Sequence, residues 1–134
     1  MSADMARKHA ESLAGSIKAA VEAGAPFGYT NAYTGEWCDW EDFEQIPEDE
    51  RGDYTEASAF DWLGDALNID YVVGSDRETV KGGRIMVGFG GPNVWVDTMT
   101  NTVDVSWWSD EASVRIPREF CERIDDALQE LWNC

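Results

Sequence analysis

Carboxylates are the groups in this sequence that could most readily do chemistry. Asp97 and Asp104 stand on either side of a predicted turn, in NVWVDT and TVDVSWW, and a hairpin would let them face each other. Two facing carboxylates can act as acid and base in a glycosidase-type reaction. A chain of 134 residues is short for a glycosidase cleft, however, and a solvent-facing carboxylate is the ordinary interpretation of any one residue. We therefore expect no enzymatic activity, with a small hydrolase or metal-dependent enzyme that uses this pair as an alternative.

The spacing of other candidate ligands argues against a bound metal or cofactor. Four carboxylates between Asp39 and Glu44 are dense enough to attract Ca²⁺ or Mg²⁺ loosely, but they do not fit the DxDxDG loop of calcium sites. The glycine-rich run GFGGP at 88–92 joins two predicted strands, whereas a phosphate-binding loop joins a strand to a helix. We expect a plain turn there, and neither a metal nor a cofactor.

Histidine and cysteine give no sign of a nucleophilic or zinc site. The single histidine, His9, falls on a predicted amphipathic helix, where a structural or exposed role is expected. Cys38, Cys121 and Cys134 are an odd number at wide spacing without a CxxC pair, which is typical of reduced cytosolic thiols. Neither a Cys–His pair nor zinc-ligand spacing is present. No catalytic residue is therefore predicted.

The acidic residues are concentrated in residues 36–65, which we call the acidic segment. It holds twelve of the 27 acidic residues and one basic residue, Arg51, so it carries −11 of the net charge of −17. Six aromatic residues are interleaved with these carboxylates, whereas a disordered acidic tail would lack them. The segment is therefore expected to fold into a surface that offers negative charge to a strongly basic partner.

The candidate partner-binding residues follow from this charge. Helical neighbours three or four residues apart are separated by about 5–6 Å, close to the spacing of phosphates along a strand. One row would use Asp39, Asp42 and either Glu44 or Glu48, and a second would use Glu56, Asp61 and Asp65. A merely solubilising acidic surface is the alternative, although its charge would be spread more evenly. The full set of candidates is Glu36, Asp39, Glu41, Asp42, Glu44, Glu48, Asp49, Glu50, Asp53, Glu56, Asp61, Asp65, Trp37, Trp40 and Trp108.

The overall charge also excludes partners. With a pI near 4.1, the chain would repel the phosphates of DNA, RNA and anionic membranes, so we expect no direct nucleic-acid or membrane binding. The sequence has no apolar run of 18 residues and no cationic-then-apolar leader. A cytoplasmic protein is therefore expected.

Hydrophobic periodicity predicts the elements that would position these residues. Helical spacing of apolar residues marks long helices at 3–23 and 117–132. Strict alternation predicts four strands, at 69–74, 83–89, 93–98 and 102–108. Within and before the acidic segment we expect short helices at 38–45 and 57–67, an ordered loop at 25–36 and a charged loop at 47–56. Residues 112–116 either add a short strand or lead into the last helix.

These elements predict a single α+β domain over residues 1–134: an antiparallel four-stranded β-meander packed against N- and C-terminal helices, with short helices in an acidic insertion. If the last two strands pair, one face would hold Val94, Val96, Val103, Val105 and Trp107. The other face would hold Trp95, Asp97, Asp104, Ser106 and Trp108. That second face is either partly covered by a helix or used for binding, since partly exposed tryptophans often anchor interfaces.

Residues 70–134 resemble an uncharacterised bacterial family that is associated with plasmids, conjugative elements and prophages. The resemblance is carried by GGPNVWVDTMTNTVDVSWWSDEA and by IDDALQELWNC at the end of the chain. Its most specific positions are Gly91, Pro92, Asn93, Trp95, Asp97, Trp107 and Trp108. The family offers no catalytic residues to transfer. It implies a mobile-element setting, in which small acidic proteins disable host defence, as DNA-mimic antirestriction and anti-CRISPR proteins do.

The sequence and the resemblance together predict an acidic phage or mobile-element protein of the bacterial cytoplasm. It would inhibit a host CRISPR effector or restriction enzyme by binding the basic nucleic-acid groove as a DNA mimic. The alternative is a non-enzymatic interaction adaptor or a homodimeric structural protein that uses Trp95 and Trp108 without mimicry.

Overall fold

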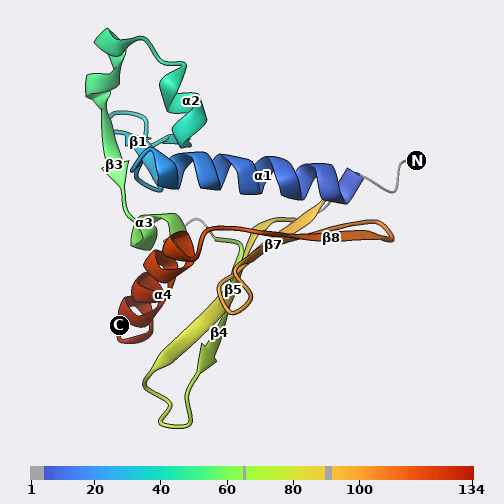
Figure 1. The fold of residues 1–134 in the computed structure, drawn as a ribbon. Helices are drawn as coiled ribbons and strands as arrows, with labels where there is room; N and C mark the ends of the chain where they lie inside the picture. The colour runs from blue at the N-terminus through green and yellow to red at the C-terminus, as the bar shows by residue number, and fades with distance from the viewer. Residues whose placement is uncertain (1–4, 65, 90–91) are drawn as a thin grey trace.

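The fold combines helices with antiparallel strands, in a computed structural model that describes residues 5–64, 66–89 and 92–134 (Figure 1). Along the chain the elements are α1 (Met5–Glu22), β1 (Gly28–Asn31), β2 (Trp37–Cys38), α2 (Trp40–Glu44), the 3-10 helix η1 (Glu48–Asp53), β3 (Tyr54–Ala57), α3 (Ala59–Gly64), β4 (Asn68–Val73), β5 (Val80–Gly88), β6 (Asn93–Asp97), β7 (Thr102–Trp107), β8 (Asp110–Arg115) and α4 (Arg118–Trp132). The predicted α+β class is confirmed. Part of the predicted turn at 88–92, including Gly91, lies outside the described residues.

Strands β4 to β8 form one antiparallel meander in sequence order. The prediction of four strands was wrong, because β8 adds a fifth at the position that the sequence left open. Val103 pairs with Val114 and Val105 with Ala112, so β8 contributes two apolar side chains to the core face. An edge strand with so few apolar residues alternates weakly, and its sequence alone could not separate a strand from a helix lead-in.

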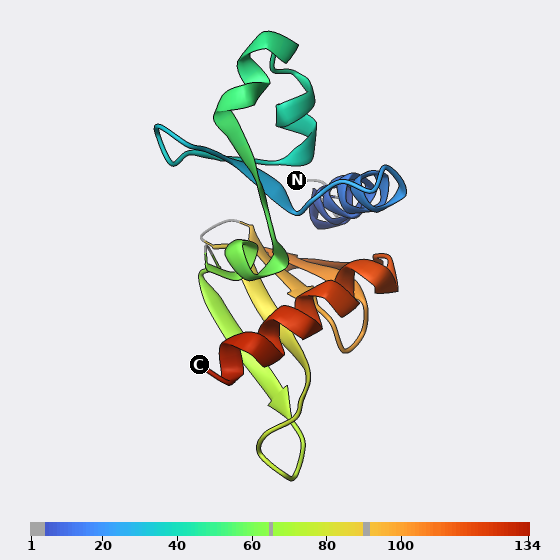
Figure 2. The same ribbon diagram turned by 90° about the vertical axis from the view of Figure 1, so that its left-hand side faces the viewer.

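The two long helices pack on the same face of this sheet (Figures 1 and 2). α1 contacts β7 and β8, and its buried alanines at 6, 10 and 14 keep that contact close. α4 contacts β5, where Ile124 and Leu128 are fully buried together with Ile85. Each large side chain removed from water in this way contributes about 1.5–3 kcal/mol to folding. The core therefore lies between one sheet face and two helices.

The β6–β7 hairpin has the core face that alternation predicted. Its valines are buried there: Val94, Val96, Val103 and Val105. Trp107 shares this face and meets His9 of α1 edge-on, with ring centroids 6.3 Å apart. Trp108 was wrongly placed on the opposite face. Its φ of 59° ends the strand and puts it in the turn before β8, where its side chain is 79% exposed.

The opposite face of the sheet carries a charged network and not two facing carboxylates. In the register of β6 and β7, Trp95 lies opposite Asp104 and Asp97 opposite Thr102, so the two aspartates are diagonal neighbours. Arg84 of β5 lies between them, 3.9 Å from Asp97 and 3.6 Å from Asp104. Its guanidinium carbon also stands 4.1 Å from the centroid of the Trp95 ring. The predicted face-to-face pair is therefore wrong, because the hairpin register offsets it.

Residues 28–57 form a second unit, the acidic lobe, which stands above the five-stranded sheet in Figure 2. Its own sheet has the strand order β2–β1–β3, with α2 and η1 between β2 and β3. The loops predicted at 25–36 and 47–56 were wrong here. These strands are two to four residues long, and Gly28 pairs with Ala57, far along the chain. Local alternation cannot mark such short strands with distant partners.

Candidate partner-binding surface

Aromatic rings form the interior of the acidic lobe. The Tyr29 and Phe43 rings are stacked with their centroids 3.6 Å apart, and Tyr54 meets Phe43 edge-on at 5.8 Å. These residues belong to β1, α2 and β3, so one ring of α2 ties the helix to two strands. Of the aromatic residues that separate the carboxylates in the sequence, Phe43 and Tyr54 thus turn inward, whereas Trp37 and Phe60 are each 37% exposed.

Arg51, the single basic residue of the acidic segment, stabilises the lobe through contacts with its backbone and with one of its aromatic rings. Its Nε donates to the carbonyl oxygen of Ile46 at 2.8 Å, and its Nη2 donates to that of Glu44 at 3.0 Å. Its guanidinium carbon lies 5.3 Å from the centroid of the Phe43 ring. Because α2 ends at Glu44, the cation sits at the negative end of a short helix. Its charge serves backbone carbonyls and is not paired with a described carboxylate.

The carboxylates of the acidic segment face solvent. Ten of them are described, and all are exposed: Glu36, Asp39, Asp42, Glu44, Glu48, Asp49, Glu50, Asp53, Glu56 and Asp61. Within the described part of the chain, the ion pairs all involve carboxylates outside this segment. The side chain of Glu41 and the whole of Asp65 lie outside the described residues. The described carboxylates therefore present negative charge that no basic side chain neutralises.

Two of these carboxylates also cap the N-terminus of a helix. Asp39 Oδ1 accepts a hydrogen bond from the backbone N–H of Asp42 at 2.8 Å, which caps α2. Asp61 Oδ2 accepts from the backbone N–H of Ser58 at 3.0 Å, and the Ser58 hydroxyl accepts from the Asp61 N–H at 3.2 Å. This reciprocal pair is a capping box at the start of α3. Both aspartates therefore fix the local geometry at the start of a helix.

The two predicted carboxylate rows are only partly set by helical spacing. In the first row Asp39 caps α2 and Asp42 and Glu44 lie on it, whereas the alternative member Glu48 lies on η1. In the second row Glu56 lies on β3 and Asp61 on α3, and Asp65 lies outside the described residues. Spacing along a single helix therefore sets distances only among the members on α2. The relative placement of these elements depends on the aromatic interior and on Arg51, which the sequence could not specify.

The negative field of the lobe acts on its neutral groups. Burial, followed by the charges of Glu56 and Glu44, raises the pKa of the Tyr29 phenol. Burial, followed by Asp42 and Asp39, likewise raises the pKa of the Cys38 thiol. A thiol with a raised pKa carries little thiolate, so Cys38 is a poor nucleophile.

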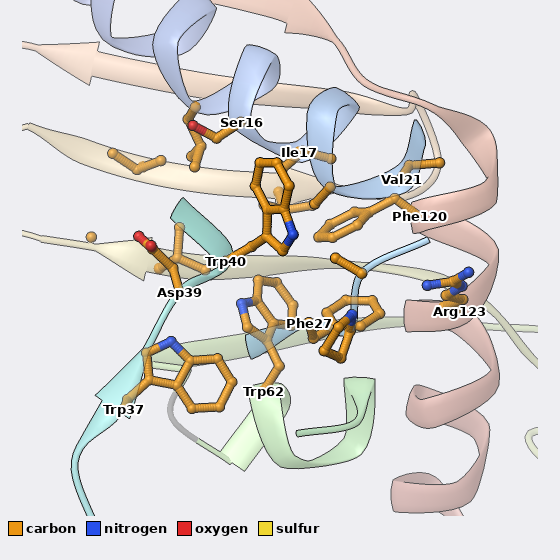
Figure 3. Close-up of a pocket in the computed structure, with 18 of the residues that line it drawn as sticks. Ser16, Ile17, Val21, Phe27, Trp37, Asp39, Trp40, Trp62, Phe120 and Arg123 are labelled. Atoms are coloured by element: carbon orange, nitrogen blue, oxygen red, sulfur yellow. The ribbon is translucent and has the colours of Figure 1, made fainter. Parts of the chain in front are cut away.

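A cavity of 580 Å³ lies between the acidic lobe, α1 and the five-stranded sheet. Figure 3 shows Trp37 and Asp39 at one end of it, Arg123 at the other end, and Trp40 and Trp62 between them. Trp37, Asp39 and Trp40 belong to the acidic lobe, and Arg123 belongs to α4. The cavity is thus an aromatic space with a carboxylate at one end and a guanidinium at the other.

The walls of the cavity are built from packed rings. Phe27 stacks on Phe120 with centroids 4.6 Å apart, and Trp62 lies 5.7 Å from Phe27 and 6.1 Å from Phe120. The indole of Trp37 lies directly on Gly28, where any Cβ atom would overlap the ring. Glycine at 28 therefore fixes the position of Trp37 at the cavity end.

The structure brings together some of the predicted partner-binding residues and separates others. Trp37, Trp40 and Asp39 meet at the cavity. Trp108 does not join them, because its turn lies near the start of α1, where Asp110 Oδ2 accepts from the Ala6 N–H at 3.0 Å. The lobe follows the other end of that helix.

Most residues that line the cavity were missed from the sequence, among them Phe27, Phe120 and Arg123. Phe27 had a signal in the aromatic, turn-rich stretch APFGYT. The other two lie on α4. The helical pattern indicates only a buried core residue at Phe120 and gives no sign of a cavity at Arg123. Their role becomes visible once α4 is placed beside the loop that follows α1.

Other reactive groups give little support to a second site. Cys121 is fully buried, and this burial raises the pKa of its thiol to about 12. Among the described residues, His, Cys, Asp and Glu form no group of three or more that could hold a metal ion. No described helix is long and apolar enough to span a membrane.

Comparison of the chain with protein-family models, with curated proteins and with solved structures finds no match in any of the three. The resemblance of residues 70–134 to a mobile-element family therefore stays a prediction.

Proposed function

We propose that the protein inhibits a basic nucleic-acid-binding protein by occupying its nucleic-acid groove with the acidic lobe. The target class is a CRISPR effector or a restriction enzyme, and the protein acts in the bacterial cytoplasm without catalysis. One observation carries the proposal: nine described, exposed carboxylates of the lobe surround a packed aromatic interior, and the one arginine among them donates to backbone carbonyls. The lobe thus keeps its charge at a real cost in self-repulsion.

A lobe of this kind suits a groove that binds a nucleic-acid backbone. Such grooves use Lys and Arg to neutralise phosphates, and the same side chains attract carboxylates held on a firm scaffold. Concentrated negative charge also steers a positive partner toward it and speeds association at low salt. The rings of Tyr29, Phe43 and Tyr54 make this scaffold rigid, since they pack α2 against two strands.

The test is a binding and cleavage assay against purified CRISPR effectors and restriction enzymes, each free or pre-bound to its DNA. The proposal expects binding to at least one free enzyme, inhibition of its DNA cleavage, and loss of binding when DNA occupies the groove. Reversal of Glu48, Asp49 and Glu50 to lysine should weaken binding by about tenfold or more, or about 1.4 kcal/mol. These three residues lie on η1.

A matched variant separates the lobe from bulk charge. Reversal of Glu78, Glu111 and Glu130 changes the net charge equally on exposed positions outside the lobe. This control should bind nearly as well as the wild-type protein. Equal loss in both triple variants, or inhibition that persists with DNA already bound, would refute groove occupation by the lobe.

A second candidate function is a homodimeric or adaptor role for the sheet face opposite the helices together with the turn between β7 and β8. It rests on the 79% exposure of Trp108 and on Trp95, which lies on the face opposite the helices. Light scattering distinguishes the two: a dimer that Trp108→Ala dissociates supports this role, and a monomer at micromolar concentration argues against it.

A further inference from the structure

The cavity beside the acidic lobe holds chemistry that the exposed carboxylates do not explain. We propose that it receives an arginine side chain of the basic partner, an inference that rests on the proposed function. The guanidinium would lie among the indoles at the Asp39 end, and the methylene stem would lie along the apolar wall.

The aromatic residues fit a cation. Trp37 lies at one end of the cavity, and Trp40 and Trp62 lie between that end and the Arg123 end (Figure 3). The face of an indole attracts a cation within about 6 Å, and the attraction grows when water is excluded. Further along, the stacked rings of Phe27 and Phe120 offer apolar surface to the methylene groups of a long side chain.

The charges of the cavity give the side chain a direction. Asp39 lines the same end as Trp37, and both belong to the acidic lobe. Arg123 lines the far end (Figure 3), and its Nη2 lies 3.8 Å from Oε1 of Glu119. A cation is therefore favoured at the lobe end over the far end.

The geometry favours arginine over lysine. A guanidinium is planar and weakly hydrated, so it stacks on aromatic rings at less cost than an ammonium. The protein uses this contact twice itself: Arg84 stands 4.1 Å from the Trp95 centroid, and Arg51 stands 5.3 Å from the Phe43 centroid. In the cavity, three indoles would make the same kind of contact with a guanidinium that the partner supplies.

The experiment titrates the protein with end-capped hexa-arginine and, separately, hexa-lysine peptides of equal charge. Binding is followed by the indole N–H signals of the seven tryptophans in nuclear magnetic resonance spectra. Hexa-arginine should shift the signals of Trp37, Trp40 and Trp62 and leave those of Trp108 and Trp132 in place. It should bind about fivefold more tightly than hexa-lysine.

Two pairs of variants locate the site. Trp37→Leu should reduce the affinity for hexa-arginine to that for hexa-lysine, whereas Trp108→Leu should not. Asp39→Asn keeps a good helix cap while it removes the charge, so α2 should stay folded. It should weaken hexa-arginine binding more than Asp49→Asn, which removes one charge from η1. This pair keeps the test valid if Trp37→Leu fails to fold.

The outcomes separate the inference from the proposed function. Equal affinity for both peptides, with no shift of the three indole signals, would mean that the surface carboxylates alone hold the cations. The arginine pocket would then be wrong while groove occupation survived. If neither peptide bound at low salt, both the inference and the proposed function would be overturned, because the lobe would not attract basic chains at all.

Discussion

Asp125 of α4 is a carboxyl group in surroundings that disfavour its charge. Its Oδ1 is buried and has no hydrogen-bond partner among the described residues. Burial raises the pKa of Asp125, the charges of Asp126 and Glu122 add to the rise, and an interaction with the Thr98 hydroxyl opposes it. The folded state therefore binds this proton more tightly than the unfolded state. Its contribution to stability is full below pH 3.8 and is lost as the pH rises through the raised pKa.

Asp125→Asn should consequently stabilise the protein at neutral pH. The amide keeps the shape and removes the buried charge, and we expect a gain of about 1 kcal/mol in the free energy of unfolding. Urea titrations at pH 7 and below pH 3.8 measure it, and the gain should vanish at the lower pH. Asp126→Asn, on the exposed side of the same helix, is the control. A gain of equal size in both variants would mean that net charge, and not burial, is the cause.

Asp76 shows the opposite behaviour in the β4–β5 turn. Its Oδ2 accepts from the Thr79 hydroxyl at 2.7 Å, and its Oδ1 accepts from the backbone N–H groups of Glu78 and Thr79, both at 3.0 Å. These bonds, with the Thr79 hydroxyl first, lower the pKa of Asp76 to about 2. The turn should thus keep its support above pH 3.8 and lose it as the pH falls toward 2.

The measurement for Asp76 is a carboxyl carbon titration by nuclear magnetic resonance. Thr79→Val should move the Asp76 pKa up toward 3.8, because it removes the strongest donor, whereas Thr79→Ser should leave it near 2. An unchanged pKa in the valine variant would show that the backbone donors suffice.

At the scale of elements, Arg51 should decide whether the acidic lobe stays folded. Arg51→Met removes two hydrogen bonds to backbone carbonyls and the contact with Phe43. We expect a local loss of about 1–3 kcal/mol, seen as faster hydrogen exchange in α2 and η1 with little change in β5 to β7. The lobe should open before the five-stranded sheet does.

Arg51→Lys distinguishes geometry from charge. Lysine keeps the positive charge but loses the planar fork that reaches both Ile46 and Glu44. We expect it to exchange nearly as fast as the methionine variant. Protection at the wild-type level in the lysine variant would instead assign the effect to relief of carboxylate repulsion.

The long elements were predictable because each one buries a face along its whole length. α1, α4 and the strands from β4 to β7 repeat apolar residues at the period of their own structure, and that pattern is local. The strands of the acidic lobe lack such a pattern. β1 is four residues long and pairs with β3 through Gly28 and Ala57, so its existence depends on a contact that no local window contains.

The candidate site divides in the same way. The carboxylates could be assigned to the surface from their density alone, and their exposure in the structure agrees with that. The cavity could not be predicted, because Phe27, Trp62 and Phe120 come from three parts of the chain that only the fold brings together. The hydrogen bonds of Arg51 to backbone carbonyls could not be predicted from the sequence either, since a lone cation among carboxylates suggests ion pairs.

At the scale of the whole molecule, charge is divided unevenly between two units. The acidic segment holds one of the ten Lys and Arg residues, and the other nine lie in α1, α4 and the five-stranded sheet with its turns. The described ion pairs all lie in that second part. Repulsion between carboxylates should therefore destabilise the lobe more than the rest of the molecule, even though both units carry net negative charge.

This division predicts how salt changes stability. Added NaCl screens the repulsion between exposed carboxylates, over about 10 Å at 0.1 M, so the melting temperature should rise with salt. The triple neutral variant Glu48→Gln, Asp49→Asn, Glu50→Gln should start a few degrees higher at low salt and gain less from added salt. The matched variant Glu78→Gln, Glu111→Gln, Glu130→Gln removes equal charge outside the lobe and should behave almost as the wild-type protein does. Scanning calorimetry across a salt series measures all three. Identical salt slopes in the two variants would show that repulsion is spread over the molecule, which would remove the charge argument for a partner at the lobe.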